Sequence, residues 1–128
     1  MKRFYVAVFM MLVMLSAGCE QTVADVTNEE LLSRLNGPHE LLVVLDVRSV
    51  DEFATGHVPG AINIPHDVLA SRLHELHARD NAEFVVYCET GRRATKAQKI
   101  LQSDGFLRVR HLQGDMAQWR RDGLPIER

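Results

Sequence analysis

The stretch that decides the fold is Phe84-Val85-Val86-Tyr87-Cys88-Glu89-Thr90-Gly91-Arg92-Arg93-Ala94. Its first four residues form a short apolar run that is typical of a buried strand, and a helical pattern opens at Arg92. Cys88 therefore stands where a strand passes into a helix. A helix start offers unpaired N–H groups and the positive end of the helix dipole, and both stabilise an anion. We expect the Cys88 thiol to ionise more readily than a free thiol, and the thiolate is the nucleophile.

Three charged residues beside Cys88 modify this expectation. Arg92 and Arg93 favour the thiolate and Glu89 opposes it, so we expect ionisation to be eased only moderately. The alternative is a buried structural cysteine, because free cysteine is among the most buried residue types. The Gly-Arg-Arg sequence that follows favours the reactive thiol.

Outward from this stretch, strand and helix patterns alternate. Strands are predicted at residues 41–45, 61–64, 84–87 and 109–112. Helices are predicted at residues 28–35, about 50–55, about 92–103 and about 116–121, and one more, capped by Asp67, carries Leu69, Leu73 and Leu76 on one stripe. The 41–45 run, Leu-Leu-Val-Val-Leu, has no polar alternation, which suits a strand buried on both faces. The alternation implies right-handed crossovers and a parallel α/β sheet.

Local signals mark the helix ends. Thr27 followed by Glu30 predicts a capping box before the first helix. Asp67 is positioned to cap the helix that follows the second strand. Gly105 is placed to adopt a left-handed conformation directly after the 92–103 helix.

The candidate site residues lie at predicted strand ends. Asp46 and Arg48 follow the first strand, and Cys88 follows the third. In open α/β sheets, sites form outside the carboxyl ends of the strands. These residues should therefore share one crevice if their strands are neighbours.

Composition limits the classes of function. A chain of 128 residues suits one modest domain, and 46% hydrophobic with 25% charged residues is ordinary for a globular protein. The formal net charge of −2 argues against nucleic-acid binding, which calls for a basic face. His74-Glu75-Leu76-His77 lacks the i, i+4 spacing of zinc proteases and is interpreted as a solvated helix face. No metal and no cofactor is expected.

The amino-terminal segment has the pattern of a secretory signal. Lys2 and Arg3 precede an uninterrupted run of 12 apolar residues, from Phe4 to Leu15, and small residues follow up to Cys19. The run is shorter than the about 20 residues that a transmembrane helix needs. We predict a signal peptide at 1–18, a lipidated tether at 19–25 and a folded domain at 26–128.

The segment from Leu15 to Cys19 resembles the bacterial lipobox, in which the cysteine is lipidated and becomes the first mature residue. Ser16 stands where leucine is usual, so cleavage by ordinary signal peptidase after Ala24 stays an alternative that yields a soluble periplasmic protein. Glu20 is not the aspartate that retains lipoproteins at the inner membrane. The resemblance therefore implies a lipid anchor on the periplasmic side of the cell envelope, at the outer membrane.

Several further motifs are spaced along the chain. In order, they are Asp46-Val47-Arg48, Glu52-Phe53, the block from Gly56 to Pro65, Tyr87-Cys88 with Gly91 and Arg93, Gly105-Phe106, and Leu112 with Gly114 and Trp119. In their residues and their order, these motifs resemble those of the single-domain rhodanese family. The resemblance runs from about Val26 to Pro125. The resemblance implies a rhodanese-like α/β fold, with a central parallel sheet of about five strands flanked by helices on both faces.

The same resemblance implies a sulfurtransferase that moves sulfane sulfur through a persulfide on a catalytic cysteine, Cys88. Thiosulfate or a persulfide would donate the sulfur, and a thiol, cyanide or an unidentified protein would accept it. The substrate would be bound by the loop of Glu89, Thr90, Gly91, Arg92 and Arg93, through its backbone N–H groups and its two arginines. Asp46 and Arg48 would support this loop rather than touch the substrate.

Two positions depart from the family pattern. Asp115 replaces the second glycine that is common after Gly114, a change that we expect to leave the fold unaffected. Glu89 is acidic where many members carry a basic or neutral residue, which leaves the preferred sulfur donor open.

Three other functions stay open. Phosphatases and arsenate reductases of related fold place an arginine six residues after the cysteine, where this chain has Ala94, and Arg93 comes one residue earlier. A tethered binding module could keep the fold without catalysis, although the retained Cys88 and Gly91 disfavour it. A redox cycle needs a second cysteine to resolve an intermediate, and a lipidated Cys19 could not serve.

Overall fold

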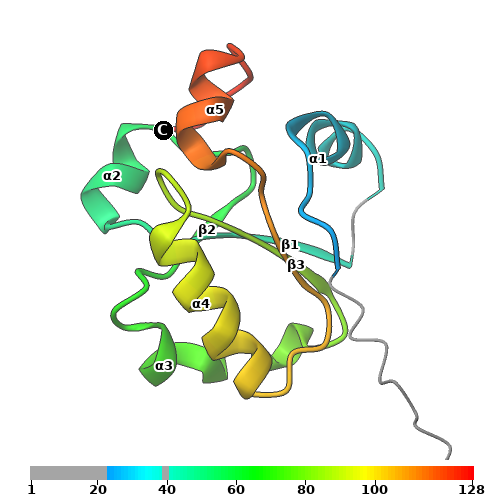
Figure 1. Cartoon of the computed structure of the whole chain (residues 1–128), viewed down its shortest axis with the longest axis vertical. Coiled ribbons are helices and arrows are strands. Elements are labelled where there is room, and N and C mark those ends of the chain that lie inside the picture. Colours follow the sequence, from blue (N-terminus) through cyan, green and yellow to red (C-terminus); the bar gives the residue numbers. More distant parts are fainter. Residues whose placement is uncertain (1–22, 39–40) are drawn as a thin grey trace, which may run out of the picture.

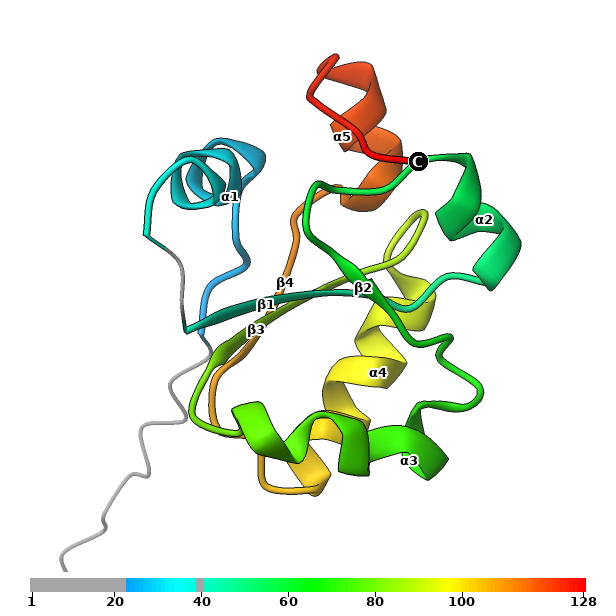
Figure 2. The same cartoon turned by 180° about the vertical axis from the view of Figure 1, so that it is seen from behind.

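The sheet at the centre of the molecule has four parallel strands in the order β2-β1-β3-β4 (Figure 1, Figure 2). The computed structural model describes residues 23–38 and 41–128. The strands are β1 (Leu42–Asp46), β2 (Ile62–Asn63), β3 (Glu83–Tyr87) and β4 (Val109–His111). Asp46 at the end of β1 lies opposite Tyr87 at the end of β3. The two strand ends that carry the predicted site residues are therefore neighbours, as expected.

The number of strands is lower than the expected figure of about five. Beside β4, the described chain adds only Val26, which pairs with Leu112 in an isolated parallel bridge. Thr27 then caps the first helix, so the chain leaves the sheet after a single residue.

Five α-helices are present in the described residues. They are α1 (Asn28–Leu35), α2 (Val50–Thr55), α3 (Leu69–Arg72), α4 (Arg92–Ser103) and α5 (Asp115–Arg121), with 3-10 turns η1 (Leu73–Glu75) and η2 (His77–Arg79). The bounds of α1, α2 and α4 match the prediction. The predicted cap at Asp67 is wrong, because α3 starts one residue later, after Val68, and has no side-chain cap.

Helices cover both faces of the sheet, which confirms the predicted layers (Figure 1). One face packs against α3 and α4, where Val43, Leu45, Phe84 and Val86 meet Leu69, Ala97 and Leu101. The other face packs against α1 and α5, where Val44, Val85 and Tyr87 meet Leu31, Met116 and Trp119. All five residues of β1 are buried, as the unbroken apolar run predicts.

Two of the predicted helix-end motifs are present, although the capping box of Thr27 and Glu30 is only half formed. Thr27 Oγ1 accepts the N–H of Glu30 at 3.1 Å, but the Glu30 carboxylate pairs with Arg110 at 2.7 Å. Gly105 has a φ of 94°, and the next N–H donates to Leu101 O at 3.1 Å. The 92–103 helix therefore ends as predicted, in a Schellman motif.

The predicted signal peptide, residues 1–18, and Cys19 lie outside the described residues. The last part of the predicted tether is held by β4, because Arg110 donates to Ala24 O at 2.8 Å and to Asp25 O at 3.3 Å. Within the described part of the chain, every helix is too short or too polar to cross a membrane.

Candidate active site

Cys88 lies at the carboxyl end of β3, where its sulfur accepts hydrogen bonds from two backbone N–H groups. The nitrogen of Gly91 is 3.0 Å from Sγ, and that of Ala94 is 3.4 Å away. Gly91 has a φ of 110°, a conformation that favours glycine, and it turns the chain into α4. The first N–H groups of α4 therefore face the sulfur and can hold a negative charge on it.

The loop carbonyls face away from this cradle because α5 binds them. The N–H of Met116 donates to Cys88 O at 3.0 Å, and the N–H of Ala117 donates to Glu89 O at 3.1 Å. The start of α5 thus fixes the orientation of two successive peptide groups of the loop. The carbonyl oxygens of Cys88 and Glu89 therefore point to α5 and away from the sulfur.

Asp115 adds a side-chain bond to the same loop, and sequence reasoning missed it. Its Oδ1 accepts the Cys88 N–H at 3.0 Å and lies 2.8 Å from His111 Nε2. The hydrogen bond from Asp115 raises the pKa of His111, against the opposing effect of burial. The sequence carried one signal, an aspartate where the family commonly has glycine. The expectation that this change has no consequence for the fold overlooks a buried hydrogen bond between Asp115 and the Cys88 loop.

The predicted substrate-binding residues of the loop have different surroundings. Thr90 and Arg92 are exposed. The guanidinium of Arg93 instead makes two bonds with the Glu52 carboxylate of α2, at 2.7 and 2.9 Å. The bond to Glu52 raises the pKa of Arg93, and the bond to Arg93 lowers the pKa of Glu52 to about 2.

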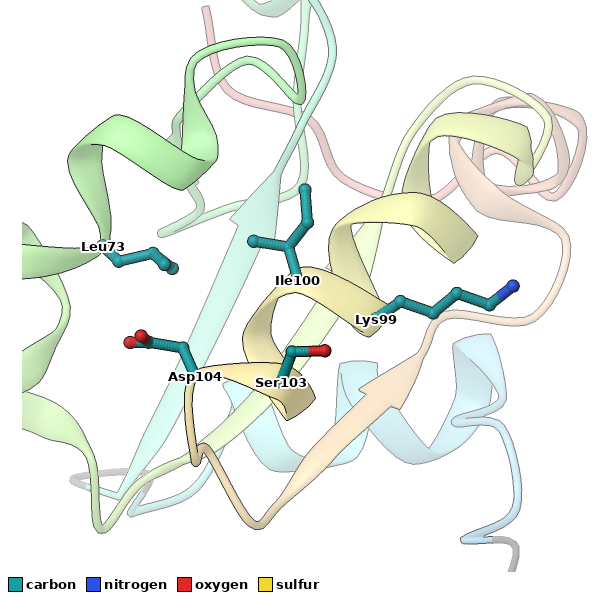
Figure 3. A pocket seen from close by; sticks show the side chains of 5 residues that line it. All are labelled: Leu73, Lys99, Ile100, Ser103 and Asp104. Atoms are coloured by element: carbon teal, nitrogen blue, oxygen red, sulfur yellow. The ribbon is translucent and has the colours of Figure 1, made fainter.

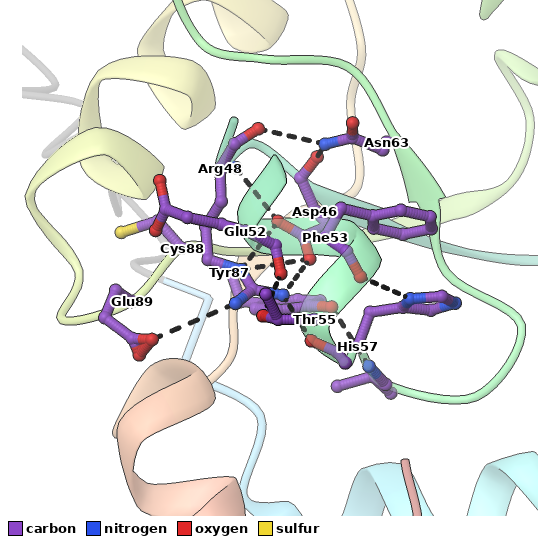
Figure 4. Close-up of polar contacts among 12 residues, drawn as sticks. Asp46, Arg48, Glu52, Phe53, Thr55, His57, Asn63, Tyr87, Cys88 and Glu89 are labelled. Carbon is purple, nitrogen blue, oxygen red and sulfur yellow. Dashed lines mark hydrogen bonds and ion pairs between the residues drawn. The ribbon is translucent and has the colours of Figure 1, made fainter. Parts of the chain in front are cut away.

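Asp46 and Arg48 form a fully buried ion pair beneath the loop (Figure 4). Arg48 Nη2 is 2.7 Å from Asp46 Oδ2 and also donates to Gly56 O at 2.8 Å. Asn63 Nδ2 donates to the backbone carbonyls of both Asp46 and Arg48, at 3.0 and 2.9 Å. These contacts tie the end of β1 to the C-terminal end of α2 and to β2, and the loop-supporting role of Asp46 and Arg48 stays a prediction.

Glu89 connects this buried pair to α5. Arg120 Nη1 lies 2.6 Å from both carboxylate oxygens of Glu89. Arg48 Nη1 lies 3.8 Å from Glu89 Oε1 (Figure 4). Arg48 Nη1 is one of two buried side-chain polar atoms in the described residues with no hydrogen-bond partner. Glu89 is therefore engaged by two arginines at the rim of the loop.

A groove of about 400 Å³ reaches the loop at Arg93. It is lined by Ser49, Val50, Pro65, His66, Asp67, Val68, Arg72 and Arg93. A separate hollow of about 360 Å³ is lined by the residues labelled in Figure 3. That hollow adjoins the C-terminal end of α4, whereas Cys88 precedes its N-terminal end. Of the residues that line the groove, Arg93 is the one that belongs to the Cys88 loop, and Cys88 itself does not line it.

Comparison with known proteins places these features in context. A family model described as a rhodanese-like domain matches residues 27–122. A sulfurtransferase of Allochromatium vinosum is 34% identical over 104 residues, covering 81% of this chain and 94% of that protein. Thiosulfate sulfurtransferase 16 of Arabidopsis thaliana, a chloroplastic protein, is 34% identical over 105 residues, covering 70% of this chain and 86% of its relative.

A solved structure and a longer relative extend the comparison. The rhodanese-like domain from Anabaena sp. matches with a TM-score of 0.72 and 29% identity, over 80% of this chain and 77% of that domain. The chain spans 42% of a putative sulfur carrier protein of Bacillus subtilis, to which it is 34% identical over 80 residues. This chain is thus also similar to a part of a longer protein.

Proposed function

The chain belongs to the rhodanese-like domain family, and we propose that it is a sulfurtransferase that carries sulfane sulfur as a persulfide on Cys88. The observation that carries the proposal is the cradle of the Gly91 and Ala94 N–H groups around Sγ. Such a cradle suits a thiolate and, one atom further out, the charged outer sulfur of a persulfide.

The reaction has two half-reactions, with thiosulfate as donor and cyanide as acceptor. In the first, the Cys88 thiolate attacks the outer sulfur of thiosulfate. A new S–S bond forms, the S–S bond of thiosulfate breaks, and its electron pair leaves with sulfite. In the second, cyanide attacks the outer sulfur and departs as thiocyanate, and the electron pair of the broken bond regenerates the thiolate.

The charged residues around Cys88 would affect how the sulfur donor binds. Arg92 is exposed beside the cradle and suits the sulfonate of an anionic donor. Arg93 shares its charge with Glu52 and borders the groove, so it would guide an anion rather than bind it alone. Glu89 is acidic where many members of the family carry a basic or neutral residue, and it pairs with Arg120, which leaves the preferred donor open. A persulfide of lower charge is therefore a second donor class to test.

The test is formation of thiocyanate by the purified protein with thiosulfate and cyanide. Cys88→Ser should lower the rate by roughly a thousandfold or more, because no other group supplies the nucleophile. Mass spectrometry after thiosulfate treatment should show one added sulfur atom on the peptide that holds Cys88. Cys19→Ser is the matched control, since it removes the other cysteine and should keep the adduct. Full activity of Cys88→Ser, or phosphate-ester hydrolysis without any adduct, contradicts the proposal.

We also propose that Cys19 is lipidated and anchors the domain on the periplasmic side of the envelope. The support is the lipobox-like segment before Cys19, after a signal-like apolar run. Cys19→Ser should release the protein from isolated membranes. A variant that stays in the membrane fraction argues against the anchor.

A further inference from the structure

We propose that Asp115 and His111 are positioning residues for the Cys88 loop, with Asp115 holding the loop in place and protonated His111 cancelling the charge of Asp115 beside the sulfur. The inference deepens the proposed function of Cys88 and rests on it. It predicts a dependence of Cys88 reactivity on the protonation of His111, a residue that touches neither the sulfur nor any reactant.

The first observation is that one buried oxygen serves both partners. Asp115 is 2% exposed, and its Oδ1 lies 3.0 Å from the Cys88 nitrogen and 2.8 Å from His111 Nε2. A carboxylate without partners at such a place would be strongly unfavourable, and here each contact satisfies it. The same oxygen therefore links the peptide group of the nucleophile to a titratable side chain.

The second observation is the backbone of Asp115. Its φ is 54°, the only positive value among non-glycine residues of the described chain. Glycine adopts this conformation freely, whereas a side chain there is strained. The bonds of the Asp115 carboxylate to Cys88 and His111 are contacts that a glycine at this position would lack.

The third observation is how closely the pair packs under the cradle. A Cβ atom on Gly91 would lie 3.0 Å from Asp115 Oδ2 and 3.2 Å from His111 Cε1. Gly91 is also the residue whose N–H donates to Cys88 Sγ. The pair therefore bonds to the loop at the Cys88 N–H and lies directly against the Gly91 backbone.

The effect of His111 on the Cys88 thiolate depends on the charged groups that surround the imidazole. The groups that face His111 are Asp115 of α5, Asp25 before α1, whose Oδ2 is 4.0 Å from Nδ1, and the backbone of the Cys88 loop. Both carboxylates favour the imidazolium. While His111 is protonated, its pair with Asp115 is neutral. When the proton leaves, the negative charge of Asp115 is uncompensated next to Cys88 and opposes the thiolate.

His111→Gln isolates this charge effect, because a glutamine amide can still donate to Asp115 but cannot carry a proton. The measurement is the rate of Cys88 alkylation by iodoacetamide from pH 5.5 to 9, followed by intact mass. The wild type should react about threefold to tenfold faster than His111→Gln below the pKa of His111. The two rates should converge above it. His74→Gln, an exposed histidine away from the loop, should match the wild type throughout.

Asp115 variants test the positioning role. Asp115→Gly relieves the backbone strain but removes the acceptor, so the protein should fold while kcat/KM for thiosulfate falls about tenfold. Asp115→Asn keeps an oxygen for the Cys88 N–H and should recover most of that loss without the His111-dependent pH effect. Urea unfolding of each variant checks that the fold persists.

Two results overturn the inference. One is a constant ratio of alkylation rates between wild type and His111→Gln across the pH range. The other is a folded Asp115→Gly variant with wild-type alkylation and turnover. Alkylation needs no sulfur transfer, so the two proposals fail separately. Converging alkylation rates without thiocyanate formation would reject the sulfurtransferase and keep the role of the pair.

Discussion

Two ion pairs beside the Cys88 loop join the same chemical groups in different surroundings. Asp46 and Arg48 are both 0% exposed, whereas the Arg93 and Glu52 side chains are 28% and 36% exposed. Arg48 donates three side-chain hydrogen bonds to Asp46, at 2.7 to 3.1 Å, and Arg93 donates two to Glu52, at 2.7 and 2.9 Å. The two pairs therefore differ most in burial, which makes the first a rigid support and the second an adjustable contact.

The physical reason is the cost of removing charges from water. A buried arginine without its carboxylate, or the reverse, leaves an uncompensated charge in a medium that solvates it poorly. An exposed partner that loses its pair is solvated at once. Removing one partner of the Asp46–Arg48 pair is therefore expected to destabilise the fold strongly, whereas removing one partner of the Glu52–Arg93 pair is not.

The largest expected effect is on stability, from the buried pair. Arg48→Met should lower the free energy of unfolding by about 3–5 kcal/mol, because Asp46 stays buried without its partner. Urea denaturation followed by circular dichroism measures this. Arg93→Met is the matched control and should cost no more than about 1 kcal/mol. Equal losses in the two variants would mean that burial does not distinguish the pairs.

A smaller effect is expected on donor binding, from the exposed pair. Glu52→Gln frees the guanidinium of Arg93 at the groove and removes one negative charge beside Arg93. The KM for thiosulfate should fall about twofold to fivefold, which matches the modest strength of an exposed pair. Asp51→Asn changes an exposed carboxylate on the same helix that does not bind Arg93, and should have less effect. A KM that rises in Glu52→Gln would show that Glu52 holds Arg93 in its productive position.

The smallest effect is the pH dependence of the exposed pair. Arg93 lowers the pKa of Glu52 from its ordinary value of 4.5 to about 2. A lowered pKa means that the pair contributes stability above pH 4.5, and that this contribution is lost as pH falls toward 2. The stability difference between wild type and Glu52→Gln should therefore be at most about 1 kcal/mol at pH 6 and vanish near pH 2. A difference that persists at pH 2 would contradict the assignment.

Short-range patterns predicted most of the elements. The apolar run, the cysteine and the helical pattern from Arg92 are contiguous, so β3, the loop and α4 lie where they were expected. The wrong cap at Asp67 is an error of one residue. Asp67 is a good capping residue, but the N-cap of α3 is the next residue, Val68. The four strands that periodicity predicts are all present, and the figure of about five, which the family resemblance implied, is too high because Val26 contributes only one bridge beside β4.

The sequence by itself determined the alternating α/β order, the position of Cys88 at a strand end and the likeness to a family. These depend on periods, turns and motifs within a few residues of one another. Only the tertiary structure decided which side chains hold the loop. Glu52 meets Arg93 across 41 residues, and Asp115 meets Cys88 across 27. The packing of strands and helices determines which residues distant in sequence come within hydrogen-bond distance of each other. A buried charged group is stable only where this packing supplies a partner.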